Sequence, residues 1–166
     1  SGETKHAYAL EVLSNILGEG ATSRLFRTLV VEEKLAVGAG SFYQGDDRGP
    51  GKFGLYASPR PGVGMETLEN KIEELVATLL RDGVTTKDVE RAKKRMRAQA
   101  VYARDSLTAG ARVLGAALAV GLSVEYVESW PDRIGAITAA DVNAAARAVL
   151  KDSHSVTSLL LQKKTG

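Results

Sequence analysis

Cysteine is absent from the 166-residue chain, and histidine occurs only twice, as His6 and His154. Without cysteine, disulfide bonds and thiolate zinc sites are excluded. The two histidines stand far apart and belong to no HExxH or HxxEH motif, the spacings that bring two imidazoles onto one zinc ion. Glu3 and His6 could meet on one helical turn, but a frayed surface pair is the better interpretation. The sequence therefore predicts no metal site and no cofactor site in this chain.

Long apolar runs are also missing, and charge of either sign is nearly balanced. No run approaches the ~20 residues of a membrane-spanning helix, so no membrane span is predicted. A net charge of +2 is too small to indicate nucleic acid by itself. The hydrophobic fraction of 44% and the length suit one domain over residues 1–166 with its own core. Because a cysteine-free chain fits cytoplasm and periplasm alike, the localisation stays open.

The hydrophobic periodicity predicts two helices, two strands, a run of helices and a last strand. The strands at 36–44 and 52–59 are joined by a short glycine- and aspartate-rich segment, so they must pair antiparallel. "SVTSLLLQ", residues 155–162, is the expected last strand. This order predicts an α+β fold, a sheet backed by helices on one face. Three strands make a thin sheet for so many helices, so a first strand is expected upstream of residue 1.

Among the helices, the segment at 107–121 is apolar almost all round apart from Arg112, which predicts a buried helix. The helix that starts near Thr85 and the helix at 65–80 are expected to cover one face of the sheet. Short polar signals mark helix starts. Thr85 with Asp88, and Thr138 with Asp141, have the spacing of a capping box.

Residues 17–40 form a helix–turn–helix–strand passage with four candidate side chains, Ser23, Arg24, Glu32 and Glu33. Ser23 has no histidine near it in sequence and no G-x-S-x-G elbow, so its hydroxyl is better interpreted as a helix cap. The turn "GEGATS" lacks the lysine of a phosphate-binding loop and does not follow a strand. No catalytic residue is predicted here.

A basic run gives the best hint of a nucleic-acid surface. On a helical wheel its members spread over most of the circumference instead of forming one stripe, and only Tyr102 is an interleaved aromatic. A solvated helix face is the favoured interpretation, and nucleic-acid binding is the weaker alternative. The run consists of Arg91, Lys93, Lys94, Arg95, Arg97 and Arg104.

The passage "LEVLSNILGEGATSRLFRTLVVEEKLAVGAGSFY" resembles the start of the second domain of the pitrilysin/insulinase family of zinc metallopeptidases, which includes the mitochondrial processing peptidase. The similarity lies in "LGEG", "SRLF" and the spaced Leu29, Glu32, Leu35 and Ala36. Three later stretches follow in the family's order: "GPGKFGLYAS", "LLRDGVTTKDVERAKKRMRAQ" and "IGAITAADVNAAARAVL". The resemblance covers nearly the whole chain.

The resemblance implies the non-zinc domain of a larger metalloendopeptidase. In that family two such domains form each half of a clamshell that closes around unfolded peptide, and the zinc ligands belong to HxxEH in the other domain. This chain alone is then expected to be inactive, forming chamber wall and inter-subunit surface. A non-catalytic scaffold or peptide-capturing subunit is the alternative.

Two positions depart from the family's pattern. Many second domains supply an Arg and a Tyr that hold the substrate carbonyl, and these positions fall on Val30 and Val37. Valine cannot donate a hydrogen bond to an oxyanion. Any Arg/Tyr pair is therefore expected from a second subunit, and Arg24 is interpreted as a structural anchor of the turn.

Overall fold

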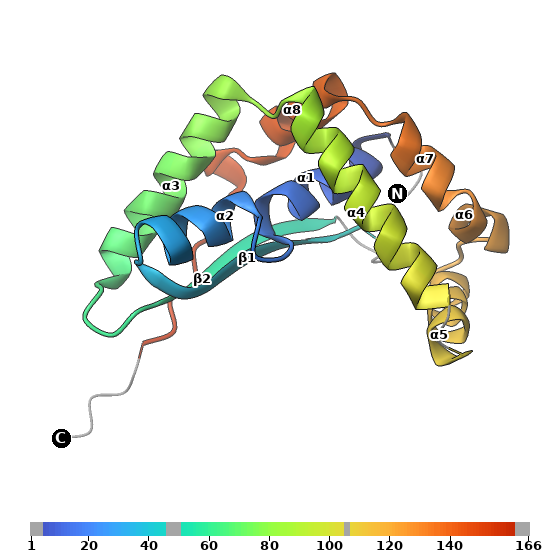
Figure 1. Cartoon of the computed structure of the whole chain (residues 1–166), viewed down its shortest axis with the longest axis horizontal. Helices are drawn as coiled ribbons and strands as arrows, with labels where there is room; N and C mark the ends of the chain where they lie inside the picture. Colours follow the sequence, from blue (N-terminus) through green and yellow to red (C-terminus); the bar gives the residue numbers. More distant parts are fainter. Residues whose placement is uncertain (1–4, 46–50, 105–106, 162–166) are drawn as a thin grey trace.

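The computed structural model describes residues 5–45, 51–104 and 107–161. Helices form an arch on one side of a β-hairpin, and the α+β fold class is confirmed (Figure 1). No helix in these ranges is long and apolar enough to cross a membrane. The elements are α1 (Lys5–Gly18), α2 (Arg24–Phe26), the π-helical turn η1 (Arg27–Glu32), β1 (Ala36–Gln44), β2 (Lys52–Pro59), α3 (Met65–Asp82), α4 (Thr86–Arg104), α5 (Leu107–Ala119), α6 (Val124–Glu128), α7 (Trp130–Ala136), α8 (Ala139–Val149) and the 3₁₀ turn η2 (Asp152–His154).

The hairpin pairs β1 and β2 antiparallel, as predicted, and the described part of the chain contains no other strand. The register places Gly40 opposite Tyr56 and Phe42 opposite Gly54. It shifts between Ala36 and Gly38, which leaves one extra residue on β1. Since side chains alternate along a strand, one face of the hairpin turns toward α1 and the other carries Phe42 and Tyr56.

Helix α1 is the centre of the core. Nearly every residue from Ala7 to Leu17 is buried. The helix contacts β1 on one side and α4, α7 and α8 on others, and between Ala7 and Leu17 only Glu11 and Ser14 are half-exposed. Its small and aliphatic side chains suit a helix that is enclosed on all sides. Where α1 crosses the sheet, the Ser41 hydroxyl donates a hydrogen bond to the Ser14 carbonyl at 2.8 Å.

Helices α3 and α4 begin where the sequence predicted, but they do not both cover the sheet. Helix α3 contacts β2, whereas α4 packs on α1 and on α7. Ala92 of α4 is buried, and Ala100, two turns later, is only half-buried. The sheet is therefore covered first by α1, and α4 forms a further layer.

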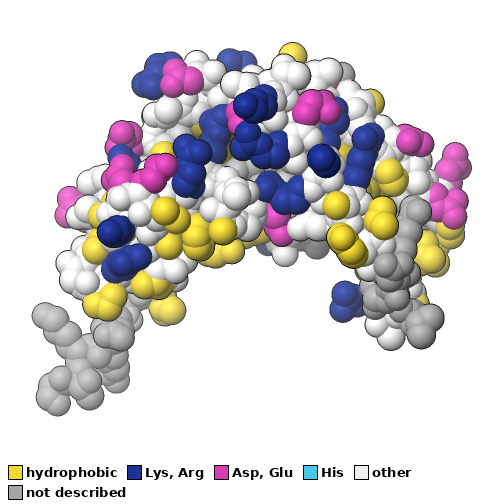
Figure 2. Space-filling model, viewed as in Figure 1, with side chains coloured by type: hydrophobic (Ala, Val, Ile, Leu, Met, Phe, Trp, Pro, Cys, Tyr) yellow, Lys and Arg dark blue, Asp and Glu magenta, His cyan; other side chains and the backbone are white. Residues whose placement is uncertain are grey.

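Helix α5 contradicts the sequence prediction of a buried helix. It contacts α4 and α6 at the end of the arch, and most of its described side chains are exposed, Val113 and Leu118 among them. Figure 2 shows hydrophobic side chains gathered at this end of the molecule. An apolar helix is buried only if a second surface reaches it, and the described residues supply one side alone.

The expected last strand is also wrong over its described residues. Residues 155–161 have no regular secondary structure, and Val156 and Leu160 are each 92% exposed. A strand exists only when its backbone groups find a neighbouring strand, and this segment pairs with neither β1 nor β2. Gln162 lies outside the described residues.

The starts of the helices agree better with the sequence predictions than α5 and residues 155–161 do. Thr138 and Asp141 form the predicted capping box, in which each side chain accepts a hydrogen bond from the other residue's backbone N–H. Within the predicted run of helices, α6 and α7 are two short helices that meet at Ser129. Proline at position 131 lies in the first turn of α7, where its missing N–H costs no helical hydrogen bond.

Candidate functional site: the passage from α1 to β1 and the open face of the hairpin

The turn after α1 is shaped by a close approach between Gly18 and the sheet. A Cβ on Gly18 would collide with the backbone nitrogen of Ser41. Only glycine therefore allows the end of α1 to lie this close to β1. Gly20 follows with a φ of 77°, in the left-handed region that favours glycine. The two glycines fix the direction in which the chain leaves α1 and enters α2.

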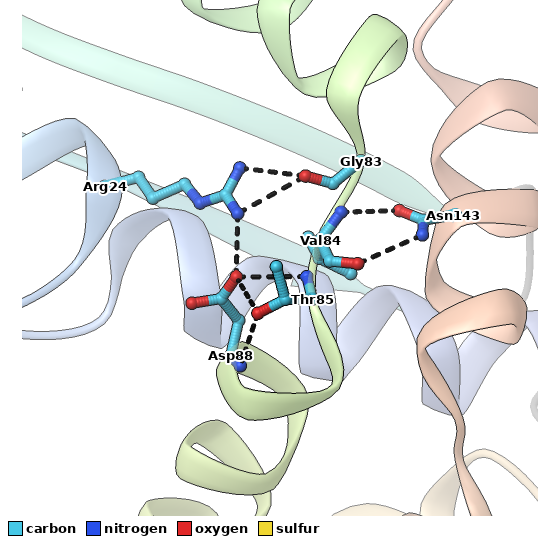
Figure 3. Close-up of polar contacts among 6 residues, drawn as sticks. All are labelled: Arg24, Gly83, Val84, Thr85, Asp88 and Asn143. Atoms are coloured by element: carbon cyan, nitrogen blue, oxygen red, sulfur yellow. Dashed lines mark hydrogen bonds and ion pairs between the residues drawn. The ribbon is translucent and has the colours of Figure 1, made fainter.

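Arg24 connects α2 to the turn between α3 and α4 (Figure 3). Its two terminal nitrogens donate to the Gly83 carbonyl oxygen at 3.3 Å, and Nη2 lies 2.9 Å from Asp88 Oδ2. On the other side of the same turn, Asn143 of α8 accepts from Val84 N at 2.8 Å and donates to Val84 O at 3.2 Å. Arg24 thus anchors a turn, but the turn is the one after α3 and not the one after α1.

Asp88 is the acceptor that holds this network together. Its Oδ2 also accepts from the Thr85 backbone N–H at 3.1 Å and from the Thr85 hydroxyl at 2.8 Å. Burial raises the pKa of Asp88, but the hydrogen bonds from Thr85 and Arg24 outweigh burial, and the pKa lies below its usual value. The carboxylate is therefore ionised at neutral pH and serves as helix cap and ion-pair partner together.

Ser23 does not make the predicted helix cap. It occupies the N-cap position of α2, but its side chain makes no capping hydrogen bond. The residue is 1% exposed, and Ser23 Oγ has no hydrogen-bond partner among the described residues. The reason is its direction: the side chain is enclosed with the core instead of lying over the free N–H groups of α2. Thr22, the other candidate cap, accepts a hydrogen bond from Arg95.

Glu32 and Glu33 make ion pairs on the surface. Glu32 pairs with Arg27 Nε at 2.9 Å, and Glu33 pairs with Lys71 Nζ at 2.6 Å. The hydrogen bond from Lys71 to Glu33, with a further one to Glu74, raises the pKa of Lys71. Neither ion pair includes a histidine or a serine. Exposed pairs of this kind contribute little to stability.

Val30 and Val37 lie on either side of the link between η1 and β1. Val30 is half-buried against the core, while Val37 is 58% exposed beside the irregularity in β1. Arg60, the residue after β2, donates to the Val30 carbonyl at 3.3 Å and to the Ala36 carbonyl at 3.2 Å. No role was predicted for Arg60 from the sequence. Its position directly after a strand that must pair with 36–44 was the available signal.

The face of the hairpin turned away from α1 carries two aromatic rings that rest on glycines. Tyr56 covers Gly40 and Phe42 covers Gly54, because a Cβ at either glycine would collide with the ring opposite. Tyr56 is 56% exposed and Phe42 is 43% exposed. We call the set of Val37, Phe42 and Tyr56 the open face. These three side chains are exposed, and Tyr56 also lines a shallow hollow with Gly20, Ala21 and Phe26 at the passage from α1 to α2.

The basic run on α4 is mostly tied to neighbouring elements. Lys93 is buried and bonds to Glu90 and to the Ile137 carbonyl, and Arg95 bonds to Asn15. Arg97 donates to the Pro131 carbonyl. The side chain of Arg104 lies outside the described residues. Of the described members, Arg91, Lys94 and Arg97 are exposed.

The described residues contain no group of three or more potential metal ligands. His6 belongs to α1 and His154 to η2, and both are exposed. Glu3, the expected neighbour of His6, lies outside the described residues.

Comparison with protein families shows which family the chain belongs to. Residues 2–96 match the family model described as Peptidase M16 inactive domain. The chain belongs to this family. The resemblance to the second, non-zinc domain of insulinase-type peptidases is thereby confirmed.

Individual relatives of the M16 domain agree with this assignment. The chain is 31% identical over 99 residues to the uncharacterized zinc protease YmxG of Bacillus subtilis, covering 60% of this chain and 24% of that protein. It is 27% identical over 157 residues to the uncharacterized zinc protease ML0855 of Mycobacterium leprae, covering 93% of this chain and 34% of that protein. The chain thus spans a minor part of the length of both.

A solved structure supports the fold. The crystal structure of a protease from Helicobacter pylori superposes with a TM-score of 0.83 at 24% sequence identity. The match covers 93% of this chain and 37% of that one. The arrangement of hairpin and helices is therefore shared with part of that protease.

Proposed function

We propose that this M16 domain forms part of the substrate chamber of a zinc metalloendopeptidase, with its open face as chamber wall and inter-subunit surface. The observation that carries the proposal is the position of Val37, Phe42 and Tyr56. All three are exposed, and Phe42 and Tyr56 lie on the face of the hairpin that is turned away from α1. An extended peptide can lay alternate apolar side chains on such a surface.

The hydrolytic chemistry of this proposal belongs to another domain. Relatives of the chain are named zinc proteases and are much longer than it. The part of the chain that the structure describes offers no cluster of metal ligands. Zinc and the HxxEH residues are therefore expected in the remainder of the parent protein, and this domain contributes surface and not ligands.

Val30 and Val37 limit the hydrogen-bond donors that this domain can contribute to catalysis. Neither side chain has a hydrogen-bond donor, and the carbonyl groups beside them at Val30 and Ala36 accept from Arg60. Stabilisation of an oxyanion requires donors aimed at the reacting oxygen. The proposal therefore assigns an Arg/Tyr pair to a second insulinase-family subunit that meets this domain.

The second candidate is a non-catalytic M16 protein that captures peptide or acts as a scaffold. It is favoured by the same two valines, since a domain without donors is compatible with a protein without hydrolysis. Both candidates use the open face to hold peptide, and they differ only in whether the parent protein has zinc chemistry.

The experiment has two arms. In the first, binding of a fluorescently labelled unfolded peptide is measured for the chain, for Phe42→Ser with Tyr56→Ser, and for Tyr102→Ser. Tyr102 is an exposed aromatic on α4 and serves as the matched control. We expect the double variant alone to lose affinity. Equal affinity for all three proteins would remove the open face from the proposal.

The second arm assays the purified parent protein without any partner. Strong peptide hydrolysis by a single component contradicts the assignment of the donors to a second subunit. Hydrolysis that appears only with a partner subunit supports it. Absence of hydrolysis under both conditions, together with peptide binding, favours the non-catalytic candidate.

A further inference from the structure

A pocket of about 340 Å³ opens on the helical side of the hairpin, between α2, α3 and α4. Its floor is apolar and includes Leu55 from the face of β2 that turns toward the helices. Leu79 of α3 and Leu25 of α2 are fully buried in this floor. Leu75 and Val76 are half-buried and remain within reach of a ligand. The pocket lies on the opposite side of the sheet from the open face.

The rim of the pocket is strongly cationic. Arg24, Arg27, Arg91 and Arg95 line it, with Asp88 as the only acidic side chain among the described lining residues. Figure 2 shows the corresponding concentration of Lys and Arg side chains around α2, α3 and α4. Glu32 pairs with Arg27 and Glu19 acts on Arg95 from outside the lining, so four guanidinium groups and three carboxylates leave a smaller excess of positive charge beside an apolar surface. This combination is suited to a ligand that is acidic and apolar together.

Two of the four arginines are available to such a ligand. Arg24 is taken by Asp88 and Gly83, and Arg95 by Asn15 and Thr22. Arg91 is exposed, and the described part of the chain offers it no partner. Arg27 is paired only with the exposed Glu32, an arrangement that is weak in water.

The pKa of Arg95 is lowered, as expected for a guanidinium group whose charge is not fully balanced by neighbouring carboxylates. Burial, the largest effect, lowers the pKa of Arg95. The carboxylate of Glu19 raises that pKa, the neighbouring Arg91 lowers it, and the net direction is downward. A bound anion beside Arg91 would offset the repulsion between the Arg91 and Arg95 guanidinium groups.

We propose that this pocket binds an acidic segment of a partner protein. A carboxylate of the segment is held by Arg91 and Arg27, and a neighbouring aliphatic side chain packs on Val76 and Leu75. Guanidinium groups bind carboxylates with two parallel hydrogen bonds, which gives direction as well as affinity. A nucleic acid fits less well, because no described lining residue is aromatic and bases need a ring to stack on. The inference is independent of the proposed chamber role, which uses the other face.

The test measures binding of a panel of fluorescently labelled peptides built from Glu, Leu and Gly in varied order. A second panel carries Lys in place of Glu. We expect the chain to bind members of the first panel and none of the second, with affinity that falls as salt rises. Arg91→Gln should weaken binding about tenfold, the scale of one charge-assisted hydrogen bond. Val76→Ser should weaken it as well, since the aliphatic contact is lost.

Arg147→Gln is the matched control, because Arg147 is exposed on α8 and does not line the pocket. It should bind like the unmodified chain. The proposal is overturned if Arg91→Gln binds as tightly as Arg147→Gln, or if no peptide of the Glu panel binds. Inorganic phosphate that binds as tightly as the best peptide would show that the apolar floor contributes nothing, which also overturns it. Circular dichroism of each variant confirms that the fold is retained.

Discussion

Arg24 Nη2 lies 2.9 Å from Asp88 Oδ2 across 64 positions of sequence, so that α2 is tied to the start of α4. We expect Arg24→Met to lower the free energy of unfolding by about 1–3 kcal/mol, since it breaks a partly buried ion pair and the bonds to Gly83. Urea denaturation measures the change. Arg27→Met, which breaks only the exposed pair with Glu32, should cost less than about 1 kcal/mol. Equal losses would mean that the Arg24 contact adds no stability.

The dependence of folding stability on pH should reveal the ionisation of the Asp88 carboxylate. The pKa of Asp88 is lower in the folded protein than in the unfolded chain, so the folded state favours the ionised form. This contribution is complete above the unfolded pKa of about 4 and is lost as the pH falls through the folded pKa. Removing the carboxylate as Asp88→Asn should therefore flatten the acid limb of a plot of stability against pH. A variant with an unchanged acid limb would contradict this role.

Close packing at the end of α1 gives a third prediction. Gly18→Ala places a Cβ against the Ser41 backbone, and the surrounding core must move to admit it. Overpacking of this kind typically costs about 1–3 kcal/mol, and contact with rigid backbone favours the upper end. Gly38→Ala is the matched control, since a Cβ at Gly38 meets no heavy atom within 4 Å. Thermal melts should show a clear loss for the first variant and a small change for the second.

Metal removal should leave the domain unaffected. The prediction follows from two distant, exposed histidines and the lack of cysteine in the sequence. Treatment with a chelator should change neither the melting temperature nor the circular dichroism of the chain, and elemental analysis should find no stoichiometric zinc. One retained equivalent of zinc would contradict the prediction. The parent protein, tested in parallel, should lose zinc and activity together.

The sequence predicted well wherever local chemistry decides the structure. The Thr–Asp pairs capped α4 and α8 as predicted, because this signal acts within one helical turn. It predicted the hairpin for the same reason, since a short loop leaves two strands no other pairing. The M16 assignment came from several such signals in a fixed order.

Prediction failed where a residue's neighbours come from elsewhere in the chain or beyond it. The segments α5 and 155–161 are rich in apolar residues. Whether such segments are buried depends on surfaces that the described residues lack. Ser23 has the right spacing for a cap, but core packing directs its side chain inward. Phe42 and Tyr56 could not be placed over Gly54 and Gly40 before the register was known. Arg60 was missed because its partners are backbone carbonyls, which no sequence motif marks, and its place directly after a strand was the one available signal.

Helix α4 allows a test of the order of the layers. The sequence predicted that it covers the sheet, whereas in the structure it packs on α1 and α7. Ala92 is 1% exposed where α4 lies in the core, while Ala100 is half-buried farther along the helix. Ala92→Glu buries a carboxylate without a partner, so we expect a loss of several kcal/mol, about 3–5, in urea denaturation. Ala100→Glu can turn its carboxylate toward water, so its loss should be below about 1.5 kcal/mol, the scale of an ordinary surface substitution and a small packing change. If the two variants lose equal stability, α4 does not run from the core to the surface as the structure places it.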